Sequence, residues 1–188
     1  MPVVNSPLLF LDFEGVLVLQ SAAKIRQIAE ALKSIGSGKA AIEDFKDLWP
    51  GLFERRARDY LKALHDEFQF AYCLTSPWAK WIDKPTMLLL LRQGGLEFVA
   101  GRLHSRWEIA PQDQATSRSA AITHWLRLNG TEIPWWVLDA QSSGSSELDW
   151  PPDMQARAIV CFRDVGLTDF ESERLRQALS NPLKPQSH

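Results

Sequence analysis

The sequence has few cysteines, no long apolar run and no large surplus of charge of either sign. Its 188 residues include two cysteines, Cys73 and Cys161, and both lie in apolar stretches. This placement indicates reduced, buried thiols instead of a disulfide framework. The longest apolar runs, such as 87–91, are far too short to cross a bilayer, and the N-terminus has no signal-peptide pattern. We therefore expect a cytoplasmic protein that makes no membrane contact.

The overall charge gives no support for nonspecific electrostatic binding to nucleic acid. A formal net charge of −2 gives no global attraction to nucleic acid. With 45% hydrophobic and 23% charged residues, the composition is that of an ordinary globular protein. The length fits one domain with a modest insertion. Nothing in the sequence indicates an oligomeric state.

Apolar runs alternate with helical periodicities along the chain. Strands are predicted at 7–13, 68–74, 96–100, 134–138 and 158–162. Helices are predicted at 21–34, 39–48 and 52–67, after Pro77, at 87–91 and 119–129, and at 169–179 with Thr168 as N-cap. This alternation predicts an α/β protein with a three-layer, Rossmann-like parallel sheet. We expect a single domain over 1–180, with 18–50 as a small helical insertion after the first strand and 181–188 as a flexible tail.

Polar residues stand at the ends of three predicted strands. Asp12 ends the first strand, Thr75 and Ser76 follow the second, and Asp139 follows the run Trp136-Val-Leu. Ligands of open parallel sheets bind beyond the carboxyl ends of the strands, near the point where the strand order reverses. The sequence therefore predicts one shared site. Trp78 and Trp81 lie near it, and two roles remain open for them, packing in the core or stacking on a substrate.

Four segments, in this order, resemble the motifs of the haloacid dehalogenase (HAD) superfamily. The segment Phe10-Leu-Asp12-Phe-Glu14-Gly-Val-Leu17 is similar to the first motif, where a second acid follows the aspartate by two residues. Thr75 in Tyr72-Cys-Leu-Thr-Ser-Pro-Trp78 resembles the second motif, Arg118 resembles the basic third, and Asp139 the acidic fourth. Asp164-Val-Gly-Leu-Thr168 is similar to a turn in small bacterial HAD proteins, including the HAD domain of multidomain RNA-repair proteins.

The resemblance implies a HAD fold and a Mg²⁺-dependent phosphatase-like hydrolase. Asp12 would attack phosphorus and form an aspartyl phosphate, and Glu14 would act as general acid and base. The Mg²⁺ ligands would be Asp12, the main-chain carbonyl of Glu14, and Asp139. The resemblance also implies a set of substrate-binding residues, namely Thr75, Ser76 and Arg118. The expected partner is a phosphorylated small molecule.

Three positions depart from the family pattern. Residue 14 is glutamate where aspartate is usual, Arg118 replaces a usual lysine, and Ala140 follows Asp139 where a second acid is common. One metal-anchoring carboxylate is therefore missing unless Glu147 or Asp149 supplies it. Two alternatives stay open: a catalytically degenerate HAD fold used as a binding or regulatory module, and a polynucleotide-end phosphatase. The balance of charge does not support nucleic acid as the partner.

Overall fold

The computed structural model describes residues 6–109, 117–130, 133–141, 150–162 and 164–180. The predicted tail, 181–188, lies outside these ranges. So does the Ser/Gly loop beyond Gln141, together with Glu147 and Asp149.

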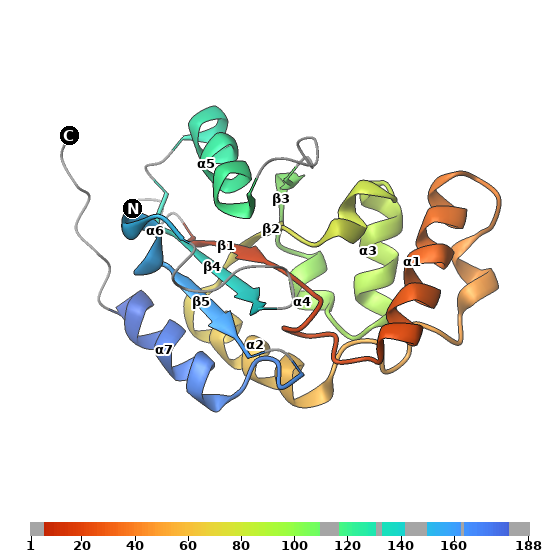
Figure 1. Ribbon diagram of the computed structural model, residues 1–188, viewed down its shortest axis with the longest axis horizontal. Coiled ribbons are helices and arrows are strands. Elements are labelled where there is room, and N and C mark those ends of the chain that lie inside the picture. Colours follow the sequence, from red (N-terminus) through yellow and green to blue (C-terminus); the bar gives the residue numbers. More distant parts are fainter. Residues whose placement is uncertain (1–5, 110–116, 131–132, 142–149, 163, 181–188) are drawn as a thin grey trace.

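Five parallel strands form one sheet, as the sequence predicts (Figure 1). The strands are β1 (Leu8–Leu11), β2 (Ala71–Leu74), β3 (Leu103–Glu108), β4 (Trp135–Ala140) and β5 (Ala158–Cys161), in the order β3-β2-β1-β4-β5. From β1 the chain builds outward to β2 and β3, and it then returns to the other side of β1 to form β4 and β5. The strand order therefore reverses beside β1, where a ligand crevice is expected.

Helices cover both faces of the sheet, which gives three layers (Figure 1). Helix α5 (Arg118–Asn129) packs on the face that carries Leu8 and Phe10. Helices α2 (Arg55–Phe68) and α7 (Asp169–Ser180) lie on the opposite face, which carries Leu9 and Leu11. All four β1 side chains are buried because both faces are covered, which explains the continuous apolar run. The remaining helical elements are α1 (Ala22–Gly36), η1 (Ile42–Phe45), η2 (Pro77–Lys80), α3 (Lys84–Gln93), α4 (Glu97–Ala100) and α6 (Pro152–Gln155).

The segment between β1 and α2 is an excursion whose two ends meet. The backbone N–H of Glu54 donates to the carbonyl of Leu17 at 2.7 Å, and the Gln20 side chain donates to the carbonyl of Gly51 at 3.2 Å. Helix α1 lies within this excursion. Its Gly36 lies so close to the main chain of Trp81 that a Cβ would fall 1.6 Å from the Trp81 carbonyl oxygen. The predicted cap insertion at 18–50 remains a prediction.

Two predicted elements are wrong. The strand predicted at 96–100 is the short helix α4, and the strand of that region is β3 at Leu103–Glu108. β3 is an edge strand with exposed polar positions, so it lacks the apolar run that marks the buried strands. The helix predicted at 39–48 is reduced to the 3₁₀ turn η1, which Trp49 closes by donating its indole N–H to the Ile42 carbonyl at 3.1 Å.

The two cysteines are reduced and buried, as their apolar sequence surroundings predict. Cys73 and Cys161 are both free and buried, and burial raises the pKa of each thiol well above its usual range. Neither thiol is therefore an activated nucleophile. Within the described ranges, every helix is too short or too polar to cross a bilayer.

Candidate functional site

Asp12 and Asp139 lie side by side at the carboxyl edge of the two strands that flank the reversal point. Leu11 pairs with Leu138 across β1 and β4, and the backbone N–H of Asp12 donates to the Leu138 carbonyl at 3.0 Å. Both side chains are fully buried. Each carboxylate accepts a hydrogen bond at 2.8 Å from the backbone N–H that follows it, that of Phe13 for Asp12 and that of Ala140 for Asp139.

A single guanidinium nitrogen joins these two carboxylates to the end of β2. Nη1 of Arg118 lies 3.1 Å from Oδ2 of Asp12 and 3.4 Å from Oδ1 of Asp139. The same nitrogen donates to the hydroxyl of Thr75 at 3.0 Å. Arg118 is the first residue of α5, and the Ser117 hydroxyl caps that helix by accepting from Ala120 N at 3.2 Å. The structure therefore brings together four of the predicted site residues.

Asp12 has unusual electrostatics for an aspartate. Burial raises its pKa from 3.8 to about 7, against the opposing effect of the Arg118 guanidinium, and the nearby Asp139 carboxylate raises it further. Its Oδ2 is buried and accepts no aligned hydrogen bond from the described residues, although Arg118 lies within ion-pair distance. A buried carboxylate oxygen of this kind is suited to accept a cation or to attack an electrophile.

Thr75 and Ser76 have different surroundings. Thr75 follows β2, its backbone N–H donates to the Leu11 carbonyl at 2.9 Å, and its hydroxyl faces Arg118. The Ser76 hydroxyl instead accepts from Trp78 N at 3.4 Å and caps η2. Thr75 thus belongs to the Asp12 cluster by direct contact. The role of Ser76 in substrate binding stays a prediction.

The Glu14 side chain makes a contact that the sequence analysis missed. Its Oε1 accepts a hydrogen bond from the indole N–H of Trp78 at 2.7 Å. Trp78 is fully buried and packs against Phe13, with ring centroids 5.7 Å apart. Trp78 therefore packs in the core, and stacking on a substrate is wrong for this residue. The sequence held one indication of this contact, namely a tryptophan three residues after Thr75, in the turn that leaves the same edge of the sheet as Glu14.

The donor set fits a hard cation that needs few protein ligands. In the parts of the chain that the structure describes, no three His, Cys, Asp or Glu side chains gather as a metal cage. Mg²⁺ commonly uses one or two carboxylates and keeps several waters. Asp12 and Asp139 offer two adjacent carboxylates, and among the residues that the structure describes the buried Oδ2 of Asp12 has Arg118 at ion-pair distance and no aligned hydrogen bond. These residues meet the requirement for Mg²⁺.

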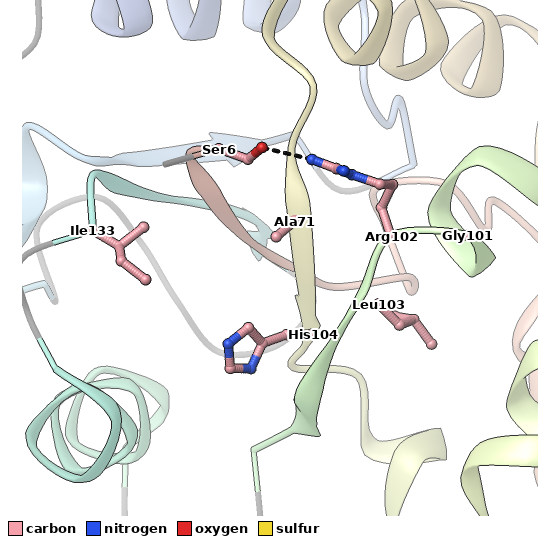
Figure 2. A pocket seen from close by; sticks show the side chains of 7 residues that line it. All are labelled: Ser6, Ala71, Gly101, Arg102, Leu103, His104 and Ile133. Atoms are coloured by element: carbon pink, nitrogen blue, oxygen red, sulfur yellow. Dashed lines mark hydrogen bonds between the residues drawn. The ribbon is translucent and has the colours of Figure 1, made fainter. Parts of the chain in front are cut away.

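A shallow groove of about 360 Å³ lies at the opposite edge of the sheet (Figure 2). Its lining includes Ser6 before β1, Ala71 at the start of β2, Arg102 just before β3 and His104 in β3. The guanidinium of Arg102 donates to the Ser6 hydroxyl at 2.6 Å and to the carbonyls of Gln69 and Phe70 at 2.9 and 3.3 Å. These bonds hold the amino ends of the strands together, which is a structural role.

Comparison with protein families places the chain. It belongs to the family of HAD domains in Swiss Army Knife RNA repair proteins, whose model matches residues 8–171. The match covers β1 to β5 and the beginning of α7, so the whole Asp12 cluster lies inside it. A search of curated proteins and a search of solved structures find no match.

Proposed function

We propose that this HAD domain is a Mg²⁺-dependent phosphatase-like hydrolase that acts through an aspartyl phosphate on Asp12. The observation that carries the proposal is the shared contact of Arg118 with Asp12, Asp139 and Thr75 at the reversal point of the sheet. A carboxylate nucleophile, a hydroxyl and a guanidinium nitrogen converge there. The carboxylate can attack phosphorus, and the hydroxyl and guanidinium can donate hydrogen bonds to phosphoryl oxygens.

In the proposed reaction, Oδ2 of Asp12 attacks phosphorus and the bond from phosphorus to the leaving oxygen breaks. Glu14 gives a proton to that oxygen, and the product alcohol departs. A water molecule then attacks the phosphoryl group, Glu14 takes its proton, and inorganic phosphate leaves as Asp12 is regenerated. The Thr75 hydroxyl and Arg118 bind the phosphoryl oxygens during both steps.

Three groups would hold the cation, namely the carboxylates of Asp12 and Asp139 and the main-chain carbonyl of Glu14. When bound, Mg²⁺ supplies the positive charge that lets an anionic ester approach an anionic nucleophile. Position 140, next to Asp139, adds no carboxylate to this set because it is an alanine, which is fully buried.

Phosphate release from a panel of phosphate esters tests this function. Wild type is compared with Asp12→Asn, each in Mg²⁺ and in EDTA. Asparagine keeps the size of the side chain and removes the nucleophilic charge. Turnover that requires Mg²⁺ and disappears in Asp12→Asn supports the proposal. A folded wild-type protein that hydrolyses no ester on the panel contradicts it and favours a binding or regulatory module.

Metal binding is tested separately by thermal unfolding. A ligand at ten times its Kd stabilises the folded state by about 1.4 kcal/mol, so Mg²⁺ should raise the Tm of wild type. The same addition should have little effect on Asp139→Asn. Equal shifts in the two proteins would mean that Mg²⁺ binds elsewhere.

A polynucleotide end is the second candidate substrate, and two observations favour it. The family is named for RNA repair proteins. The exposed ring of Phe162, with 56% of its surface accessible, directly follows β5 on the side of the sheet where Asp139 ends β4: Cys161, the residue before it, pairs with Ala140, the residue after Asp139. An exposed aromatic ring near a phosphate site is suited to stack on a nucleobase. Phe162→Ala should then raise KM for 3′- or 5′-phosphorylated oligonucleotides more than for small esters, whereas equal KM changes would oppose this substrate.

A further inference from the structure

The hydrogen bond between Trp78 and Glu14 links two parts of the chain that are 64 residues apart. Glu14 belongs to a tight turn after β1, in which the backbone N–H groups of Leu17 and Val18 both donate to the Phe13 carbonyl, at 2.9 and 2.8 Å. Trp78 lies in η2, three residues after Thr75. The bond therefore connects the turn after the nucleophile with the segment after the phosphate-facing hydroxyl.

The indole fixes the position of the carboxylate, because the indole itself is fixed. Trp78 is fully buried and contacts Phe13, and its backbone N–H is bound by the Ser76 hydroxyl. A tryptophan N–H is a donor only, and leaving it without an acceptor inside a protein is costly. Glu14 supplies that acceptor at 2.7 Å, at the short end of the range for N–H···O hydrogen bonds.

The length of the Glu14 side chain is matched to this partner. An aspartate at position 14 would be shorter by one C–C bond, about 1.5 Å. Its carboxylate would then lie beyond hydrogen-bond range of the same indole unless the backbone moved. The glutamate that departs from the family pattern and the tryptophan at position 78 thus form a complementary pair.

We propose that Trp78 is a positioning residue that holds the Glu14 carboxylate for proton transfer to the leaving oxygen. This inference rests on the proposed function, in which Glu14 is the general acid. The proton still moves between Glu14 and the leaving oxygen, and Trp78 donates one hydrogen bond without being consumed. In a purely structural role, by contrast, Glu14 would only satisfy the buried indole.

Trp78→Phe separates these two roles, because it keeps an aromatic ring and removes the N–H. Esters with a poor alkyl leaving group need the acid, whereas 4-nitrophenyl phosphate needs it much less. A misplacement of about 1 Å can cost roughly a hundredfold in rate. We expect kcat for an alkyl phosphate to fall by about tenfold to a hundredfold, with a clearly smaller fall for the nitrophenyl ester and little change in KM. Equal losses on both esters would overturn the proposal.

Trp81→Phe is the matched control, since it makes the same substitution three residues along the chain. Trp81 is partly buried, and its ring contacts the ammonium groups of Lys33 and Lys80, at 5.1 and 5.0 Å from the centroid. We expect this variant to affect the two esters alike. A leaving-group dependence as strong as that of Trp78→Phe would show that the effect is not specific to the Glu14 contact.

Glu14→Asp completes the test, because it removes the acceptor of the indole N–H and keeps the aromatic ring of Trp78 packed on Phe13. Because the shorter side chain already loses the indole, adding Trp78→Phe to Glu14→Asp should reduce kcat no further. Independent, multiplicative losses in the double variant would mean that the two residues do not act together.

A measurement without substrate separates this inference from the proposed function. The indole ¹H–¹⁵N resonance of Trp78 should shift in Glu14→Gln and Glu14→Asp, while that of Trp81 stays in place. If no ester is hydrolysed but the Trp78 resonance shifts, the phosphatase proposal fails and the contact stands. An unchanged Trp78 resonance in both Glu14 variants would overturn the positioning role, whatever the activity.

Discussion

Nη1 of Arg118 lies 3.1 Å from Oδ2 of Asp12, so two residues more than a hundred positions apart in the sequence form an ion pair. The same atom is within 3.4 Å of Asp139. A buried pair of carboxylates would repel strongly without a cation between them. Arg118 therefore helps to keep the site folded, and it also faces the group that a substrate phosphate would approach.

Replacement of Arg118 should weaken phosphate binding. Hydrogen bonds to charged groups contribute about 1.5–3 kcal/mol, or roughly tenfold to a hundredfold in affinity. We expect Arg118→Met to lower kcat/KM by that factor and to weaken binding of inorganic phosphate measured by calorimetry. Arg118→Lys should recover part of the loss, because it restores the charge without the planar fork. Phosphate affinity equal to wild type in Arg118→Met would contradict this role.

The buried Asp12 should make stability depend on pH. The pKa of Asp12 is about 7 in the folded protein and 3.8 as for an ordinary aspartate in the unfolded chain. Between these two pH values the folded protein keeps a proton that the unfolded chain has lost. The stabilisation is complete below pH 4, declines as pH rises to about 7, and is absent above that. The decline is at most about 1.4 kcal/mol per pH unit.

Urea unfolding in EDTA measures this effect as the difference between wild type and Asp12→Asn. That difference should fall between pH 4 and 7 and then level off. Arg118→Met provides a second check. Because the guanidinium lowers the pKa of Asp12, its removal should extend the decline to higher pH. A difference that is constant with pH would mean that Asp12 is ionised throughout.

Thr75 and Ser76 are adjacent, but their substitution should have different effects. Thr75→Val removes the hydroxyl that faces Arg118 and keeps the branched shape, so we expect kcat/KM to fall by about tenfold. Ser76→Ala removes the cap of η2 and should lower the free energy of unfolding by about 1 kcal/mol. Its effect on kcat/KM should be the smaller of the two. Steady-state kinetics and urea unfolding of both variants provide the comparison, and a larger kinetic loss in Ser76→Ala would reverse the assignment.

The sequence predicts the parts of the fold that are buried on both faces. β1, β2, β4 and β5 are short apolar runs because helices cover both sides of the sheet. β3 was predicted wrongly because only Trp107 of its six residues is buried, so the strand lacks a continuous apolar run. Asp12 and Asp139 were predictable as neighbours, since parallel strands bring their carboxyl ends to the same edge.

Side-chain contacts between distant segments were not predictable in the same way. The hydrogen bond from Trp78 to Glu14 depends on the turn at Gly15, on the direction of η2 and on the packing of Phe13. None of these leaves a periodic pattern in the sequence. The motif order suggested that Arg118 belongs to the site, but only the start of α5 beside Thr75 determines which groups its guanidinium contacts.

Gly166 should be more sensitive to alanine than another glycine of similar backbone conformation. Its φ is +76°, and a Cβ there would lie 2.8 Å from the Val16 carbonyl oxygen and 2.9 Å from the Leu19 side chain. The next residue, Leu167, donates its backbone N–H to that same carbonyl at 2.9 Å. The turn before α7 thus packs directly on the loop that follows Glu14.

Gly38 is the control, because its φ is +72° and no atom of the described part of the chain lies within 4 Å of the position of a Cβ. Gly38→Ala should cost only the strain of a left-handed residue, about 1 to 2 kcal/mol. Gly166→Ala should cost a further 1 to 3 kcal/mol or so, because the Val16 carbonyl must move. Since Val16 is two residues from Glu14, we also expect Gly166→Ala to lower kcat, whereas Gly38→Ala should not. Equal unfolding free energies for the two variants would mean that the loop after Glu14 yields to the added methyl group, and that the turn before α7 does not constrain the site.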